Sequence, residues 1–416
     1  MRIAIVGTGI SGLACAHYLS RRHEVVVFEA DERPGGHTHT HHLDLADGPV
    51  DVDTGFLVYN ERTYPLFCRF LDHLGVATQP GDMSFSVADK LSGTEWRGTS
   101  PATVFARPSN ALRPGFWAML RDIARFNRAA RRLLSSPPSD SYTLADMLEG
   151  HRWSRTFVDW YLVPIGSSIW SASPATVTSI PAATFARFFE RHGLLRTFDQ
   201  PSWRTVSGGA RRYVDAVLGP LVSEGRLRLG TPVDKLRRHD GYVEVVSRHG
   251  PENFDHVVVA THSDQALAML SDADRLERDL LGAIAYQPNV ATLHTDARLM
   301  PRARRAWASW NYRRCHPEAE RATLTYWLNS LQGLTTATPL LVTLNQADEI
   351  DPSKVIAQMD YSHPVMSSKA VTAQRQWSQL NGRRRTWFCG AYWGYGFHED
   401  GVRSAVQTCE RLGVVP

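Results

Sequence analysis

The alternation of apolar and polar residues predicts a chain of mixed strands and helices. A short apolar strand at residues 2–6 runs into a glycine-rich turn and a helix, and a second apolar strand covers residues 24–28. Residues 285–345 alternate as expected for the strands of a second sheet. Further β segments are predicted at 226–229, 233–236, 242–246 and 255–260, with a strand, a glycine-rich turn and a helix over 386–416.

The middle of the chain has helical patterns. Residues 63–75 predict a helix that ends at a C-capping glycine, and residues 100–200 are helical and rich in aromatic side chains. Within them, 113–134 predict a basic amphipathic helix, with apolar residues near one face and arginines largely elsewhere. Such a helix either covers a domain or lies on an anionic membrane surface, and we favour the first reading.

The first strand, the helix and the second strand contain glycines and an acidic residue at a spacing typical of a nucleotide-binding unit. Gly7, Gly9 and Gly12 form a GxGxxG turn between the first strand and the helix. In this pattern the glycines give a tight turn, close backbone approach to a pyrophosphate and close helix–strand packing. Glu29 follows the second strand, 22 residues after Gly7, where a carboxylate can hold ribose hydroxyls. The segment therefore predicts dinucleotide binding.

Composition narrows the class of protein. The 416 residues are enough for two domains. The net charge is only +4 and the basic residues form no dense stripe along the sequence, so we expect no nucleic-acid partner. Five cysteines without a CxxC pair favour a reducing cytosol. The first strand begins at Arg2 and no run of about 18 apolar residues occurs. We therefore expect a cytoplasmic protein, with peripheral contact at the inner membrane face as an alternative.

Several further motifs resemble those of the flavin-containing amine oxidase superfamily, which also holds protoporphyrinogen oxidases and phytoene-type desaturases. They are the Gly35-Gly36 pair after Glu29, Asp53-Thr54-Gly55, Thr231-Pro-Val233, Val259-Ala260-Thr261, and the closing segment Gly390 to Gly401. The resemblance implies an α/β (α+β) fold: an FAD-binding Rossmann-like domain of the glutathione-reductase-2 type with an interleaved substrate domain of mixed sheet and helices. The FAD domain would combine 1–62, 203–280 and 385–416, and the substrate domain 63–202 and 281–384.

The resemblance also implies which residues contact FAD. In the closing segment a helix N-terminus would point at the flavin, with aromatic residues as walls around the ring. The implied cofactor contacts are Gly7, Gly9, Ile10, Ser11, Gly12, Glu29, Ala30, Gly35, Gly36, His37, Thr54, Gly55, Phe56, Val233, Ala260, Thr261, Gly390, Tyr392, Trp393, Gly396, Phe397 and His398.

The chain departs from the superfamily pattern at informative places. His37 replaces a usual basic residue, Ala391 replaces a ribitol-binding Glu, and no lysine occurs in 286–294, where family amine oxidases often hold one near the flavin. Cys389 lies inside a predicted strand, so we expect non-covalent FAD. The candidates for substrate-side roles are Tyr59, His294 and His398. The alternating histidines of 37–42 look like a metal tract, but no cysteine or carboxylate cluster supports one, and we predict no metal.

A narrower resemblance concerns the substrate. Segments 54–65, 82–87, 168–171, 307–312 and 394–401 resemble bacterial predicted NAD/FAD-binding proteins that are often encoded beside cyclopropane-fatty-acyl-phospholipid synthase-like methyltransferases. This implies an FAD-dependent oxidoreductase that desaturates or otherwise oxidises a lipid or fatty-acyl substrate, or reduces or isomerises it, by hydride transfer to or from flavin N5. The alternatives are an amine oxidase that releases hydrogen peroxide, and a flavin-binding accessory protein of a fatty-acyl methyltransferase partner.

Overall fold

A parallel sheet forms the centre of one half of the molecule. The computed structural model describes residues 1–196, 201–315 and 321–416, so 197–200, the end of the predicted helical stretch, and 316–320, within the predicted second sheet, lie outside the described residues. Within the described residues the strand order is β10-β2-β1-β14-β20, and all neighbours run parallel. The strands are β1 (Arg2–Val6), β2 (Glu24–Phe28), β10 (Leu227–Arg228), β14 (His256–Val259) and β20 (Thr386–Phe388).

Helices cover both faces of this sheet. Helix α1 (Ile10–Leu19) packs against α16 (His398–Arg411), and α10 (Arg211–Ser223) lies beside α1. An antiparallel sheet and two helices pack on the other side, where Val26 and Phe28 meet Val245 and Phe254 in one apolar cluster. These elements are β11 (Val233–Arg238), β12 (Val243–Ser247), β13 (Gly250–Phe254), α11 (Ser263–Met269) and α12 (Arg275–Leu281).

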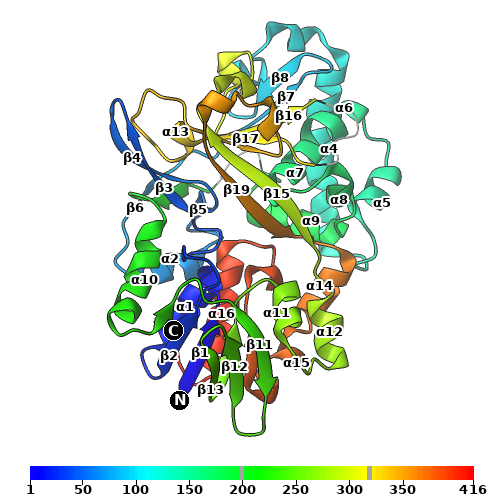
Figure 1. The fold of residues 1–416 in the computed structure, drawn as a ribbon. Coiled ribbons are helices and arrows are strands. Elements are labelled where there is room, and N and C mark those ends of the chain that lie inside the picture. The colour runs from blue at the N-terminus through cyan, green and yellow to red at the C-terminus, as the bar shows by residue number, and fades with distance from the viewer. Residues whose placement is uncertain (197–200, 316–320) are drawn as a thin grey trace.

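A larger, mostly antiparallel sheet forms the second half, drawn above the first in Figure 1. In the described part of the chain its order is β19-β15-β18-β17-β16-β7-β8, in which only the β16–β7 pair is parallel. Its strands are β7 (Phe85–Asp89), β8 (Thr94–Arg97), β15 (Tyr286–His294), β16 (Trp310–Arg314), β17 (Leu324–Trp327), β18 (Leu341–Leu344) and β19 (Val355–Pro364).

Helices gather beside the β7–β16 end of this sheet (Figure 1). The longest, α4, packs its apolar face, including Phe116, Met119 and Phe126, into the interior, whereas Arg121, Arg128 and Arg132 are exposed. The amphipathic helix predicted at 113–134 is thus a covering helix. The group comprises α4 (Pro114–Ser135), α5 (Leu144–Glu149), α6 (Arg155–Phe157), α7 (Val163–Trp170), α8 (Pro174–Thr178) and α9 (Ala182–Arg191).

Short sheets connect the two halves. They are the hairpin β3 (Thr40–Leu45)–β4 (Gly48–Asp53) and the three strands β5 (Tyr59–Asn60), β9 (Trp203–Val206) and β6 (Thr78–Pro80). The chain also crosses between the halves from α12 to β15 and again after β19. In the fully described part of the chain, the structure matches the predicted mixed α/β class, and each β segment predicted from 226 to 260 contains a strand. Gly75 has a left-handed φ of 65°, as expected of the glycine that follows the helix α2 (Pro65–His73).

Two segments pack differently from the predicted domain division. The predicted division places helix α2 in the substrate domain, but its Phe67, Phe70 and Leu71 are buried in the same apolar cluster as α1 and α16. Helices α14 (Ser368–Gln374) and α15 (Trp377–Leu380) contact α12. Their Ala373 and Leu380 belong to the apolar cluster that lies between the parallel sheet and the strands β11 to β13. Each of these helices lies where its apolar face is buried. The order of the segments along the chain does not show which of the two halves buries that face.

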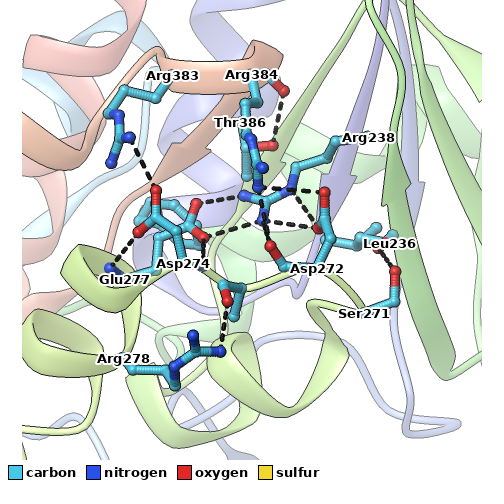
Figure 2. A network of polar contacts seen from close by, with 12 residues as sticks. Leu236, Arg238, Ser271, Asp272, Asp274, Glu277, Arg278, Arg383, Arg384 and Thr386 are labelled. Carbon is cyan, nitrogen blue, oxygen red and sulfur yellow. Dashed lines mark hydrogen bonds and ion pairs between the residues drawn. The ribbon is translucent and has the colours of Figure 1, made fainter.

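A buried ion network ties α12 to β11 and to the turn before β20. Figure 2 shows Arg238 of β11 between Asp272 and Glu277, with Arg383 and Arg384 reaching in from the turn. The side chains of Arg238 and Glu277 are each only 1% exposed, and the Glu277 carboxylate also accepts a hydrogen bond from the backbone N–H of Asp274. Each buried charge therefore has both an ionic partner and hydrogen bonds, the condition under which burial is tolerated.

Candidate functional site

The first glycine turn leaves an open space at the N-terminus of α1. Gly7 has a φ of 100°, and a Cβ on Gly12 would lie 1.9 Å from the Gly7 carbonyl oxygen, so strand and helix approach closely only with these glycines. A Cβ on Gly9 would meet no heavy atom within 4 Å. Unpaired N–H groups of a helix N-terminus attract anions. The open space and these donors fit a pyrophosphate.

Glu29 is held rigidly at the end of β2. Its buried carboxylate accepts hydrogen bonds from the backbone N–H of Thr8 (2.8 Å) and of Asp31 (3.1 Å), and from the Thr8 hydroxyl. Two carboxylate oxygens accept about four hydrogen bonds, so capacity remains for a ribose hydroxyl. Ala30 follows it, and Thr231, two residues before Val233, donates its N–H to the Glu29 carbonyl (2.7 Å). The predicted ribose and adenine contacts therefore lie at one edge of the sheet.

The second glycine pair closes over the first turn. Gly35 and Gly36 both have positive φ, and a Cβ on Gly36 would lie 3.1 Å from the Gly9 Cα. Arg33 organises this loop by donating to the carbonyl oxygens of Thr38 (2.8 Å) and Gly36 (2.7 Å). The loop therefore has a guanidinium close to the pyrophosphate space, although His37 replaces the basic residue expected directly after Gly36.

The segment Thr54–Phe56 lies against the chain at His37. Phe56 donates its N–H to the His37 carbonyl (3.1 Å), and a Cβ on Gly55 would lie 1.9 Å from the same oxygen. The Thr54 hydroxyl is 3.4 Å from the hydroxyl of Tyr361 on β19. Backbone at Gly55 therefore connects the glycine loops with the larger sheet, which fits the predicted passage of this segment close to a flat cofactor.

Ala260 and Thr261 pack on the glycine turn from the next strand. A Cβ on Gly7 would lie 3.0 Å from the Ala260 carbonyl oxygen and 3.4 Å from the Thr261 methyl group. The Ala260 N–H donates to the carbonyl of Val6 (2.8 Å), which continues the β1–β14 pairing up to the turn. Both residues thus pack directly on the first glycine turn.

The closing segment brings a second helix N-terminus to the same place. A Cβ on Gly401 of α16 would lie 2.7 Å from Ile10 Cγ2 and 2.9 Å from Ser11 Oγ, so the first turns of α16 and α1 are in contact. Asp400 accepts the N–H groups of Tyr395 (2.9 Å) and Phe397 (3.1 Å) and so shapes the glycine-rich turn before α16. Two converging helix N-termini concentrate positive potential at one point.

Aromatic side chains surround this point. Tyr392 is buried and its ring lies 5.0 Å from that of Trp393, with Gly390 directly under the Tyr392 ring. The glycine at 396 has a φ of 93° and lies against Pro364 at the end of β19. The Phe397 ring stacks on Phe188 of α9 at 5.3 Å. Of the predicted aromatic walls, Phe397 therefore lies between the closing segment and the second half of the molecule. Tyr392 and Trp393 pack instead against Ile284 and Ala370.

His398, a candidate for a substrate-side role, is part of this wall. Its ring stacks on Phe56 at 3.6 Å, and Nε2 is 3.0 Å from the Tyr213 hydroxyl. Burial lowers the pKa of His398 to about 3, so the ring is neutral at physiological pH. It offers a hydrogen bond and a flat apolar face, not a charge.

The other two candidates are buried in the interior. Tyr59 lies beside Phe67 (5.2 Å between ring centroids) and Phe56 (6.5 Å), whose rings both also contact His398, and it pairs with Arg204 of β9. His294 is fully buried at the end of β15 away from the glycine loops, with Nε2 2.7 Å from the Thr343 hydroxyl and Nδ1 accepting the Asp296 N–H. Both His294 nitrogens are used within the core, so the structure does not bring this residue to the site.

Strand β19 contributes residues that sequence reasoning missed. Tyr361 stacks on His37 at 4.9 Å, and His363 meets the same ring edge-on at 5.3 Å. His262, which stands where the superfamily usually has glycine, lies 6.0 Å from His37 and stacks on Tyr286 at 4.3 Å. Tyr361 and His363 are two residues apart on a strand and share a face. The alternation along the strand could have shown that Tyr361 and His363 lie on one face. The sequence does not show that this face contacts His37.

The charges around the cradle are mostly neutralised. Burial lowers the pKa values of His37 and His262, and that of His363 to about 4, so all three are neutral near pH 7. Burial raises the pKa of Asp53 to about 7, and its carboxyl accepts the N–H of Ala210 (2.9 Å). In the described residues no group of three histidine, cysteine or acidic side chains could hold a metal ion.

The buried acids of the closing segment are also occupied. The Glu399 carboxylate accepts the N–H groups of Leu66 (3.1 Å) and Phe67 (3.0 Å) at the start of α2. Asp400 accepts two backbone N–H groups and pairs with Arg403 (2.9 Å). These carboxylates hold backbone in place, and so they are not free to bind a ligand cation.

Comparisons with known proteins identify the family and the fold. The model of the family "Flavin containing amine oxidoreductase" matches residues 10–360. Cyclohexylamine oxidase from Brevibacterium oxydans IH-35A superposes with a TM-score of 0.69 at 17% identity over 99% of both chains. A putative protoporphyrinogen oxidase from Exiguobacterium sp. 255-15 gives 0.69 at 17% identity, over 99% of this chain and 98% of that one.

A third similar structure is a CLA-producing fatty acid isomerase from P. acnes, with a TM-score of 0.65 at 15% identity over 99% of both chains. At these identities the superpositions show the fold, whereas the family match covers most of the sequence. The chain therefore belongs to the flavin-containing amine oxidoreductase family, and it is an FAD-dependent oxidoreductase.

Proposed function

We propose that this oxidoreductase acts on the hydrocarbon part of a lipid or fatty-acyl substrate, by hydride transfer to or from FAD. The observation that carries the proposal is that the ionisable groups around the cradle are either neutral or already bonded within the protein. The histidines there have lowered pKa values, and the carboxyls of Asp53, Glu399 and Asp400 bind backbone N–H groups. An ammonium substrate needs a free carboxylate or an exposed ring face for tight binding, whereas an acyl chain needs apolar walls.

The chain's own residues would perform three tasks. The glycine turns and Glu29 bind the dinucleotide, and the N-termini of α1 and α16 favour negative charge that develops beside them. The aromatic contacts of Phe188 with Tyr395 (5.4 Å) and Phe397 (5.3 Å) keep water from this side of the site. When bound, FAD supplies the hydride chemistry, and the protein supplies orientation and a dry environment.

FAD would be held without a covalent bond. Cys389 is fully buried in the strand segment before Gly390, and its sulfur lies 3.7 Å from that of Cys15 in the core between sheet and helix. A thiol packed in this way is a structural core residue.

The substrate class is tested by the visible spectrum of the purified holoenzyme under anaerobic conditions. We expect the flavin absorption to bleach when a fatty-acyl phospholipid is added, and to stay unchanged with cyclohexylamine or putrescine. If a redox-neutral isomerisation takes place instead, net bleaching is absent and the lipid product shows a shifted double bond by mass spectrometry. Bleaching by amines with peroxide release in air, and none by lipids, would contradict the proposal.

An amine oxidase is the second candidate. Cyclohexylamine oxidase shares the fold, and the partly buried rings of Trp393 and Tyr395 offer cation–π contacts. The accessory role with a fatty-acyl methyltransferase stays a prediction, which copurification of the two proteins would test.

Peripheral membrane contact is also proposed, at the start of α4 and not along its length. Leu112 is 86% exposed and Trp117 52% exposed, and the Trp117 indole N–H donates to the carbonyl of Ala111 (2.9 Å), so the two apolar side chains lie close together. Arg121 is exposed one turn further along. Tryptophan, leucine and arginine together are typical of membrane-interface contacts. None of the helices in the described ranges is long and apolar enough to span a membrane.

We expect the holoenzyme to cosediment with vesicles of phosphatidylcholine and phosphatidylglycerol (3:1). The double substitution Leu112→Ser and Trp117→Ser should reduce the bound fraction at least about tenfold, since each large apolar side chain contributes roughly 1.5–3 kcal/mol when buried. Val222→Ser, which removes a 61% exposed apolar side chain on α10, is the control and should change nothing. Equal binding of both variants would rule out this surface.

A further inference from the structure

His363 lies where the larger sheet meets the glycine loops. It pairs with Gln287 across the β15–β19 ladder, and its neighbour Pro364 contacts the site of Gly396 in the closing segment, at 3.2 Å from a Cβ placed there. Its ring is 5.3 Å from His37, the residue after the second glycine pair. His363 is therefore a residue of the second half that faces the cofactor cradle.

A hydrogen-bond chain anchored by backbone groups leads to His363, and it starts at Asn345. Asn345 Oδ1 accepts the N–H of Val290 (3.0 Å), and its Nδ2 donates to the carbonyl of Ala322 (2.9 Å). A backbone N–H can only donate and a carbonyl can only accept, so the orientation of the Asn345 amide is determined. Asn345 has a φ of 59°, a conformation that asparagine tolerates better than most residues.

The amide of the buried Asn289 is oriented in turn by its hydrogen bond with Asn345. Its Oδ1 accepts from Asn345 Nδ2 (2.8 Å), and its Nδ2 donates to the carbonyl of Gln287 (3.3 Å) and to His363 Nδ1 (3.1 Å). His363 Nδ1 must then be the acceptor, and the single proton of the neutral ring lies on Nε2. A proton on Nδ1 would point at the N–H of Asn289.

The Nε2 atom has no protein partner. Within residues 1–196, 201–315 and 321–416 no hydrogen bond to His363 Nε2 is formed, and the side chain is only partly buried. The titratable groups that face the ring are His37 and His262, and burial together with His262 lowers the pKa of His363 to about 4. The ring is therefore neutral and has one donor to offer.

We infer that His363 presents Nε2–H to an acceptor oxygen of the substrate, the carbonyl or carboxylate oxygen of an acyl group, and that Asn289 and Asn345 are the positioning residues that select this tautomer. The inference rests on the proposed function and specifies a polar subsite for the acyl group of that substrate. A hydrogen bond of this kind favours acyl oxygens over ammonium groups, which have only donors.

The tautomer is tested by ¹⁵N-histidine NMR of the holoenzyme, with His363→Gln to assign the resonance. We expect Nε2–H and unprotonated Nδ1 between pH 5.5 and 8. In Asn289→Asp the new carboxylate accepts from Nδ1, so the proton should move to Nδ1 and the pKa of His363 should rise. Asn253→Asp adds the same charge at an exposed position of β13 and should leave the His363 signals unchanged. Nδ1–H in the wild-type protein would overturn the inference.

The subsite is tested by titrating decanoate and decylamine while recording the flavin absorption band. We expect Asn289→Asp and His363→Gln to weaken decanoate binding by about 10-fold to 100-fold, as for loss of a hydrogen bond to a charged group, with FAD affinity unchanged. Decanoate binding equal in wild type and variants would refute the subsite while the proposed function stands. Weakened FAD binding with unchanged decanoate would assign the donor to the cofactor instead, against the inference. Wild-type binding of decylamine but not decanoate would refute the proposed function itself.

Discussion

Replacing Gly9 with valine should abolish FAD retention while the apoprotein stays folded. A side chain at this position meets no protein atom within 4 Å, and the Gly9 φ of −61° suits any residue. The new atoms would occupy the space that the pyrophosphate needs. With two charge-assisted hydrogen bonds lost at roughly 1.5–3 kcal/mol each, FAD affinity should fall by about 100-fold or more.

The measurement is the flavin-to-protein absorbance ratio after purification and after reconstitution with FAD, with circular dichroism as the test of folding. Gly219→Val is the matched control, because Gly219 in α10 also has no atom within 4 Å of a Cβ but lies away from the cradle. A folded Gly9→Val protein with full flavin content would disprove the assignment of the α1 N-terminus to the pyrophosphate.

Replacing Arg238 with methionine should cause the largest loss of stability that we predict. The substitution leaves the carboxylate of Glu277, 1% exposed, without its ionic partner in the interior. Removing one member of a buried pair costs about 3–5 kcal/mol, mostly from the uncompensated charge. Asp272 is 36% exposed and keeps Arg384 as a partner, so it should add little.

Urea unfolding monitored by circular dichroism measures this loss. Arg237→Met is the control on the same strand: Arg237 is 52% exposed, and its pair with Glu244 should contribute less than about 1 kcal/mol. The double variant Arg238→Met, Glu277→Leu should regain much of the stability, since no buried charge remains. Equal midpoints for Arg238→Met and Arg237→Met would show that the network in Figure 2 carries no special stability.

Part of the candidate site was predictable because its function depends on local backbone geometry. Gly7, Gly12 and Gly36 stand where a Cβ would collide or where φ is positive, and such requirements appear directly in the sequence as glycine. Glu29 follows from its distance to the turn, since one strand–helix–strand unit has a nearly constant length. The closing helix was predictable for the same reason.

Other parts depended on contacts between distant segments. Arg33 holds the glycine loop through hydrogen bonds to backbone carbonyl oxygens. Every residue has such a carbonyl, so the sequence does not show that this arginine bonds to these two. His294 has a side chain that is common in active sites, but its hydrogen bonds to Thr343 and Asp296 hold it in the core. The placement of α2 depended on which of two cores its Phe67 and Phe70 would join.

The sequence by itself determined the dinucleotide cradle, the mixed α/β class and the strand–turn–helix closing segment, because steric limits and hydrophobic periodicity act over a few residues. Only the tertiary structure decided the polar chemistry opposite the cradle. Asn345, Asn289 and His363 lie on three different segments, and strand pairing alone brings them together. The proton on His363 is directed by backbone groups of Val290 and Ala322, which carry no sequence signal because every residue has them.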